Sequence, residues 1–166
     1  LRGNQRGKIW LEDLYSHPEL DIALRGGDRI LIEEDTRSFV ALGATGAQQK
    51  VPFETKNLSA LEGIAQVGGL NAGTADPTGV FVFRNEPEAV VAQVLGRNDL
   101  QGAQRMVYVL DLTKPNGMFM ARDFVIRDGD TLYVTEAPFT QWSKVISSIT
   151  GSASSVNNLS SLASSN

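Results

Sequence analysis

Two stretches of the sequence repeat each other, DIALRGGDRILIEED at residues 21–35 and DFVIRDGDTLYVTEA at residues 123–137. Each passes through a Gly-Asp pair and continues as a segment with alternating apolar residues. Because Gly can adopt a positive φ, this pattern predicts a tight structural turn followed by a strand, with the Asp bonding backbone N–H groups of the turn. Aligned at a constant offset, the identical pairs are Asp21 and Asp123, Arg25 and Arg127, Gly27 and Gly129, Asp28 and Asp130, and Glu34 and Glu136.

The repeat predicts two tandem copies of one domain. We expect residues 1–36 to be the C-terminal part of a first copy, residues 37–137 to be a complete second copy, and residues 138–166 to be a separate C-terminal segment. Because the chain begins at Leu1 and no signal-peptide pattern follows, we also expect it to be a fragment or processed product. The alternative is chance similarity, since Gly-Asp turns are common.

The complete copy begins with signals for strands and one short helix. Residues 38–53 contain two apolar-rich segments separated by glycines, which predicts a pair of strands. Ser59 and Glu62 then form a capping box that predicts the start of a helix, and a Gly-Gly pair at residues 68–69 predicts its end. Residues 79–84, with the sequence GVFVFR, predict the next strand.

The second half of this copy predicts a further helix and two more strands. Asn85 is expected to cap the helix, with Pro87 in its first turn and Gly96 at its end. Residues 105–112 predict a strand, and the repeated turn and strand close the domain. Together these elements predict an α+β domain in which a mixed sheet grips one helix, the β-grasp arrangement.

Composition excludes several classes of protein. The 166 residues carry a net charge of -4, so a nucleic-acid partner, which requires a basic surplus, is not expected. The absence of cysteine excludes disulfide scaffolds, zinc fingers and thiol catalysis. No window of about 20 residues is continuously apolar, so no ordinary transmembrane helix is predicted.

No group of residues predicts catalysis or metal binding. His17 is the only histidine and has no evident partner for a triad or a metal site. The acidic run at residues 33–35 is a solvated edge in the simplest interpretation, with Ca²⁺ binding as the alternative. Four aromatic residues could stack on sugars, although at strand positions a place in the core is the more common role: Trp10, Tyr15, Phe119 and Tyr133. We therefore expect no catalytic residue, no metal and no cofactor, and we expect that the protein is not an enzyme.

Longer motifs in the same region resemble a known family. They are a helix L-x-x-L-E-x-I-A-x-x-G-G-L at residues 58–70, a strand DP-x-x-VFVFR at residues 76–84, and an ending R-x-GD-x-LYV followed by AP. In these motifs the chain is similar to the Wza-like polysaccharide export proteins of the Gram-negative outer membrane, which contain soluble-ligand-binding β-grasp (SLBB) domains. The resemblance covers about residues 8–150.

The resemblance implies a function and a set of partners. It implies a structural subunit of an outer-membrane translocon that exports capsular or extracellular polysaccharide, with the SLBB domain in the periplasm. The implied partners are further copies of the same chain in a ring, the exported polysaccharide, outer-membrane lipid and an inner-membrane export or co-polymerase complex.

The charge-free C-terminal end has a helical pattern of its own. Apolar residues recur at steps of three and four, and the opposite face is polar, which predicts an amphipathic helix over residues 138–166. Because its hydroxyl groups cannot face lipid, a membrane-spanning helix of this kind requires a ring with the polar face inward, and the resemblance implies such a barrel. The predicted membrane-facing residues are Phe139, Trp142, Val145, Ile146, Ile149, Val156, Leu159 and Leu162, and the predicted lumen-facing residues are Ser143, Ser147, Ser154, Asn158 and Ser161.

Two alternatives remain open at this point. The Ser-rich end can be a disordered tail, because Ser and Gly disfavour a helix in water. The domain can also be a soluble carbohydrate-binding or adaptor β-grasp module that acts as a monomer.

Overall fold

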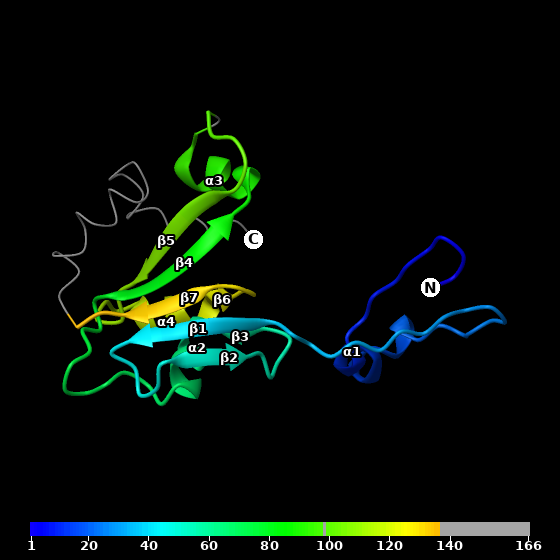
Figure 1. Cartoon of the computed structure of the whole chain (residues 1–166), viewed down its shortest axis with the longest axis horizontal. Helices are drawn as coiled ribbons and strands as arrows, with labels where there is room; N and C mark the ends of the chain where they lie inside the picture. The colour runs from blue at the N-terminus through cyan, green and yellow to red at the C-terminus, as the bar shows by residue number, and fades with distance from the viewer. Residues whose placement is uncertain (98, 137–166) are drawn as a thin grey trace. The chain divides into compact units, whose positions relative to one another are not determined.

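The computed structural model describes residues 1–97 and 99–136 of the chain (Figure 1). The chain divides into two units, Leu1–Thr36 and Arg37–Asn166, and this boundary falls directly after the first copy of the repeated sequence. The predicted amphipathic helix over residues 138–166 lies outside the described residues. Within the part of the chain that the structure describes, no helix is long and apolar enough to cross a membrane.

The first unit contains little regular structure. Its elements are the helix α1 (Leu11–Ser16) and the 3₁₀ helix η1 (Pro18–Leu20). None of residues 1–36 is buried, and the alternating apolar residues of the predicted strand are largely exposed, with Ile30 at 67% and Ile32 at 90%. The repeated sequence therefore has no hydrophobic core around it in this unit.

The second unit is built on a five-stranded mixed sheet. Its strand order is β2-β1-β7-β4-β5, in which β1 and β7 are parallel and the other neighbours are antiparallel. A second sheet pairs two short strands, β3 with β6. The strands are β1 (Ser38–Gly43), β2 (Gln49–Pro52), β3 (Leu58–Ser59), β4 (Val80–Glu86), β5 (Gln104–Leu110), β6 (Val125–Ile126) and β7 (Thr131–Val134).

Helices pack on one face of this sheet and enclose the core. Side chains alternate between the two faces of a strand, so Val80 and Val82 of β4 point toward the helices together with Leu132 of β7, and all three are fully buried. Ile64 of α2 (Ala60–Gln66) joins the same core. The mixed sheet with helices confirms the predicted α+β class (Figure 1).

The capping box predicted for α2 is present. The backbone N–H of Glu62 donates to the Ser59 hydroxyl, and the Glu62 carboxylate accepts from the backbone N–H of Ser59 at 2.8 Å. These bonds stabilise the charged carboxylate and lower the pKa of Glu62 below its ordinary value. Because the box satisfies backbone groups at the helix start, the local sequence was sufficient to place this helix.

The predicted cap of the next helix is wrong. Asn85 lies inside β4, which continues to Glu86, and the helix α3 (Glu88–Leu95) begins after Pro87 at its N-cap. The predicted end is confirmed, because Gly96 has a positive φ of 63° at the C-cap. The reach of β4 beyond Arg84 comes from pairing with β5 along its whole length, a long-range interaction that local cap signals do not report.

Residues 85–105 form an arm that extends from the sheet. In Figure 1, β4 and β5 run together away from the other strands, and α3 lies at the end of the arm. A further helix, α4 (Gly117–Asp123), follows β5 and was not predicted. Its first residue must be a glycine, because a Cβ at Gly117 would overlap the backbone carbonyl of Asp111.

Candidate functional site

The Gly-Asp turn at residues 127–130 lies directly before β7. Gly129 has a positive φ of 80°, and the backbone N–H of Asp130 donates to the carbonyl of Arg127 at 3.1 Å. The Asp130 carboxylate accepts a hydrogen bond from the backbone N–H of Arg127 at 2.8 Å. The Asp side chain therefore closes the turn that the Gly permits.

The same carboxylate binds a guanidinium from the neighbouring strand. Arg84 of β4 donates from Nε to Asp130 Oδ1 at 2.9 Å and from Nη2 to Oδ2 at 2.6 Å. Nη2 also donates to the backbone carbonyl of Val125 at 2.8 Å. Both side chains are buried, at 7% and 1% exposure, so this bidentate pair ties the turn to the base of the arm.

A second buried carboxylate completes a charge cluster that reaches the surface at Arg127. Glu86, at 1% exposure, accepts from Arg127 Nη1 at 2.9 Å and from the Tyr108 hydroxyl at 2.7 Å, and it lies 3.4 Å from Arg84 Nη1. The cluster thus balances two guanidinium groups against two carboxylates. We name Arg84, Glu86, Tyr108, Arg127 and Asp130 the arm-base cluster.

Burial and hydrogen bonding shift the pKa values of Tyr108 and Arg84 in this cluster. Burial, followed by the hydrogen bond to Glu86, raises the pKa of Tyr108 above its ordinary value of 10.0. Burial alone would lower the pKa of Arg84, but its interactions with Asp130 and Glu86 outweigh burial and raise that pKa. At neutral pH the Tyr108 phenol is consequently protonated and the Arg84 guanidinium is charged.

The first unit repeats this geometry. Asp28 accepts from the backbone N–H of Arg25 at 2.8 Å, and Gly27 has a φ of 92°. Arg2 donates from Nε to Asp28 Oδ1 at 2.9 Å and from Nη2 to Oδ2 at 2.7 Å, and Nη2 also bonds the carbonyl of Ala23 at 3.1 Å. The hydrogen bonds to Arg2 and Arg25 lower the pKa of Asp28. Each turn is therefore held by a bidentate arginine that also bonds a backbone carbonyl five residues before the Asp.

The two arginines were not predicted from the sequence. Arg84 and Asp130 are 46 residues apart, whereas Arg2 and Asp28 are 26 apart. A search at constant offset aligns the turns and cannot align the arginines, because 20 more residues separate arginine from aspartate in the second unit. A gapped comparison that starts at Leu1 and at Phe83 would have found them.

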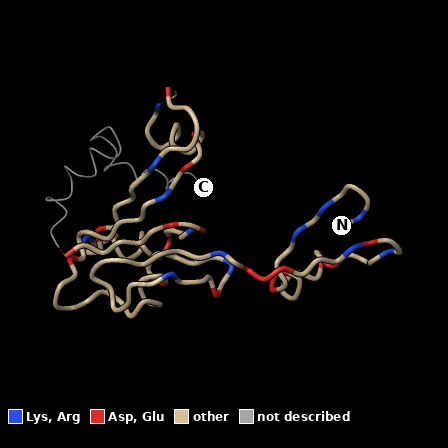
Figure 2. Tube along the Cα trace, in the orientation of Figure 1, with Lys and Arg blue, Asp and Glu red and all other residues tan. Residues whose placement is uncertain are grey.

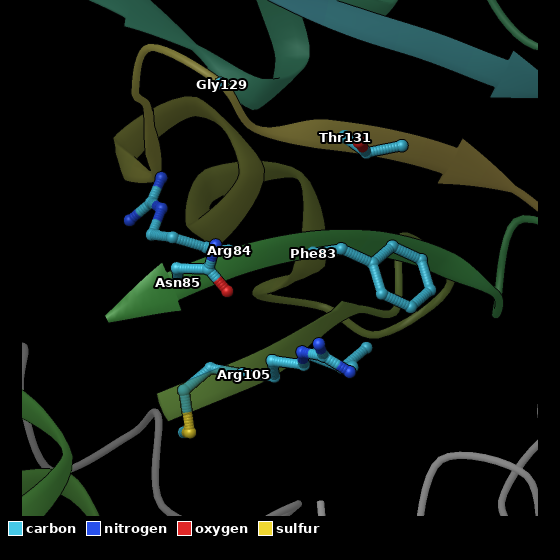
Figure 3. Close-up of a pocket in the computed structure, with 8 residues that line it drawn as sticks. Phe83, Arg84, Asn85, Arg105, Gly129 and Thr131 are labelled. Carbon is cyan, nitrogen blue, oxygen red and sulfur yellow. The ribbon is translucent and has the colours of Figure 1, made fainter. Parts of the chain in front are cut away.

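A small pocket lies on the face of the sheet opposite the core. It has a volume of about 220 Å³, and its lining includes Phe83 and Asn85 of β4, Arg105 and Val107 of β5, and Thr131 of β7. Figure 3 shows these strands side by side with the labelled side chains on them. Arg84, Glu86 and Tyr108 of the arm-base cluster thus lie on β4 and β5, which also line this pocket, and the turn with Arg127 and Asp130 lies beside it.

The remaining candidate residues lie in different places. The membrane-facing and lumen-facing residues predicted between Phe139 and Leu162 lie outside the described residues. His17 is exposed, and its Nδ1 lies 2.9 Å from Oε1 of Glu19. The acidic run, visible as a red stretch before β1 in Figure 2, has Glu33 and Glu34 exposed.

Of the four aromatic residues expected in the core, Trp10 and Tyr133 are half-buried, whereas Tyr15 and Phe119 lie outside the core. They are 80% and 58% exposed, so the expectation that they are buried is wrong. The guanidinium of Arg122 instead lies over the ring of Phe119, 5.2 Å from the ring centroid, as in a cation-π contact.

Comparison with known proteins assigns the family of this fold. The family model for the SLBB domain matches residues 37–134, which include all seven strands and the arm-base cluster. The chain belongs to the SLBB domain family. The resemblance seen in the sequence motifs is thereby confirmed.

Several relatives of this SLBB protein are named as polysaccharide export proteins. The chain is 34% identical over 170 residues to the capsule polysaccharide export outer membrane protein CtrA of Neisseria meningitidis, covering 95% of this chain and 43% of the relative. It is 34% identical over 169 residues to the capsule polysaccharide export protein BexD of Haemophilus influenzae, covering 95% and 42%. It is 34% identical over 136 residues to the Vi polysaccharide export protein VexA/TviF of Salmonella typhi, covering 81% and 36%. The chain spans less than half the length of each.

Proposed function

We propose that this chain is part of an outer-membrane protein that exports capsular or extracellular polysaccharide, as a structural subunit of a translocon and without enzymatic activity. The observation that carries the proposal is the 34% identity to CtrA over 95% of the chain, since this similarity extends beyond the SLBB domain at both ends. The location is the outer membrane, with the SLBB domain in the periplasm. The partners are the exported polymer, outer-membrane lipid and an inner-membrane export or co-polymerase complex.

Residues 1–36 belong, in this proposal, to the end of a first SLBB domain. The repeated turn geometry supports this, because the Arg2 and Asp28 pair has the same bonds as the Arg84 and Asp130 pair. Exposure supports it as well: Ile32 is 90% exposed, whereas the equivalent Val134 is fully buried. Preceding strands of the same protein would cover the apolar residues of this unit as they do in the second domain.

Residues 138–166 form the membrane element in this proposal. Their apolar stripe and polar opposite face support a helix that is shared in a ring of identical subunits, with Ser and Asn residues toward an aqueous lumen. SLBB domains stacked in the same ring would continue the conduit. A path lined by hydroxyl groups binds a polymer weakly, which suits passage.

Deletion of the C-terminal segment tests the proposal. The full-length protein and a version that stops after Pro138 are produced in a strain lacking the gene, followed by membrane fractionation, electron microscopy in detergent and measurement of surface polysaccharide. We expect rings, outer-membrane association and surface polymer with the full-length protein only. Unchanged rings and membrane association after the deletion would refute the barrel. A soluble monomer that binds a defined oligosaccharide would favour an adaptor module instead.

A further inference from the structure

The pocket on the open face of the sheet has the chemistry of a ligand site. Neighbouring strands bring its residues together in register: Phe83 pairs with Val107 on one side and with Thr131 on the other, and Asn85 pairs with Arg105. Half-buried Phe83 and Val107 form the apolar floor of the pocket, and half-buried Thr131 adds a hydroxyl group beside them. Asn85 and Arg105 are exposed at the edge. An apolar floor with a few polar groups at the edge is the usual composition of a small-molecule site.

The polar groups of this edge are not used by the fold. Arg84 and Arg127 of the adjacent cluster each bind a buried carboxylate. Among residues 1–97 and 99–136, by contrast, the side chains of Arg105 and Asn85 form no ion pair or side-chain hydrogen bond. As far as the described residues go, the guanidinium of Arg105 is therefore without a carboxylate partner, and it lies across the strand pair from Asn85 in a pocket that Phe83 also lines.

The size of the pocket limits what it can hold. Its volume of about 220 Å³ is below the roughly 300–1,000 Å³ of pockets that enclose drug-sized ligands. It accommodates one ring of a ligand whose remaining part lies outside. A polymer that passes over the sheet face meets this requirement, because one residue can enter while its neighbours stay in solvent.

We propose that the pocket formed by Phe83, Asn85, Arg105 and Thr131 binds one acidic sugar residue of a polysaccharide. The carboxylate is held by the planar guanidinium of Arg105, whose donors match both carboxylate oxygens. The apolar face of the sugar ring packs on Phe83, and Asn85 bonds a hydroxyl group. This inference rests on the proposed function in export and specifies an anionic polymer as its substrate class.

An oligosaccharide titration of the full chain tests the proposal. Trigalacturonic acid is the acidic probe and maltotriose is the neutral probe of equal length, and binding is followed by amide chemical shifts. We expect trigalacturonic acid to shift the signals of Phe83, Asn85, Arg105 and Thr131 with millimolar affinity and maltotriose to bind at least several-fold more weakly. Arg105→Gln should lower the affinity for trigalacturonic acid by roughly five-fold, because an exposed ion pair contributes binding free energy of that order. Arg105→Lys should lower this affinity by less.

Arg122→Gln is the matched control, since Arg122 is an exposed arginine on α4, at the helix-covered side of the sheet. It should leave the affinity unchanged. Equal affinity for the two probes, an equal loss in Arg105→Gln and Arg122→Gln, or no shift at the pocket would each overturn the proposal. Asn85→Ala is a second variant that does not alter the apolar floor, and it should weaken both probes if the site is correct.

The export proposal is tested separately in the same experiment series. If the full-length protein with Arg105→Gln restores surface polysaccharide while neither probe binds the wild-type chain, the acidic-sugar site is wrong and the export function stands. If the full-length wild-type protein neither reaches the outer membrane nor restores the polymer, the export function is wrong whatever the titration shows.

Discussion

Arg84 and Asp130 form a buried bidentate ion pair that joins strand β4 to the turn before β7, with Nε to Oδ1 at 2.9 Å and Nη2 to Oδ2 at 2.6 Å. The pair connects the base of the arm to a turn 46 residues later in the sequence. It lies where the pairing of β4 with β7 ends, at Phe83 and Thr131, and where β4 continues with β5 alone.

Replacement of Arg84 should destabilise the domain strongly. Arg84→Met leaves Asp130 buried without its partner, and loss of one member of a buried pair costs about 3–5 kcal/mol. Urea unfolding measures the change. Arg122→Met, which removes an exposed ion pair with Asp123, is the control and should cost about 1 kcal/mol or less. Similar losses in the two variants would show that the buried pair contributes no more than a surface pair.

Tyr108 should ionise at a higher pH than an ordinary tyrosine. Its pKa is raised by burial and by the bond to Glu86, so its protonated form stabilises the fold below pH 10, and this contribution is lost as the pH rises through the folded-state pKa. The measurement is alkaline titration by ultraviolet absorbance of the wild type and Tyr108→Phe. Their difference isolates Tyr108, and a midpoint at or below pH 10 would contradict the expectation.

The capping box of α2 should make stability depend on pH through Glu62. Its pKa is lowered in the folded protein, so its contribution is present above the unfolded-state pKa and disappears as the pH falls through the folded-state value. The stability difference between wild type and Glu62→Gln should therefore be larger at pH 7 than at pH 3. Ser59→Ala, which removes the other half of the box, should cost about 1 kcal/mol at pH 7. A constant difference would exclude the charge effect.

Two glycines should respond differently to alanine. At Gly117 a Cβ overlaps the backbone of Asp111, and such overpacking costs typically about 1–3 kcal/mol. At Gly129 the space is open, but φ is 80°, so the cost is conformational and about 1–2 kcal/mol. Thermal unfolding of the two variants tests this, and Gly117→Ala should have the lower midpoint. A Gly117→Ala variant more stable than wild type would show that helix propensity dominates there.

Local signals in the sequence predicted those parts of the fold that depend on neighbouring residues. The capping box at Ser59 and Glu62 lies within four residues, and the alternation of β7 follows directly from its sequence. The end of β4 could not be predicted in the same way, because its pairing with β5 decides that Asn85 is a strand residue.

The candidate site was less predictable for the same reason. Asp130 was recognised through its repeated turn, but its partner Arg84 comes from another strand. The pocket arises only when Phe83, Arg105 and Thr131 meet in adjacent strands, and no spacing in the sequence encodes their proximity.

The arm is the part of this architecture that can vary in length. Arg2 pairs across a short hairpin with Gln5, whereas Arg84 pairs with Met106 across the whole arm, and yet each arginine holds its aspartate with the same bonds. The bidentate pair of arginine and aspartate therefore forms whatever the length of the segment inserted between the paired strands. The two units of this one chain already differ in the length of this insert, so the same position offers protein engineers a place to graft a foreign loop or reporter.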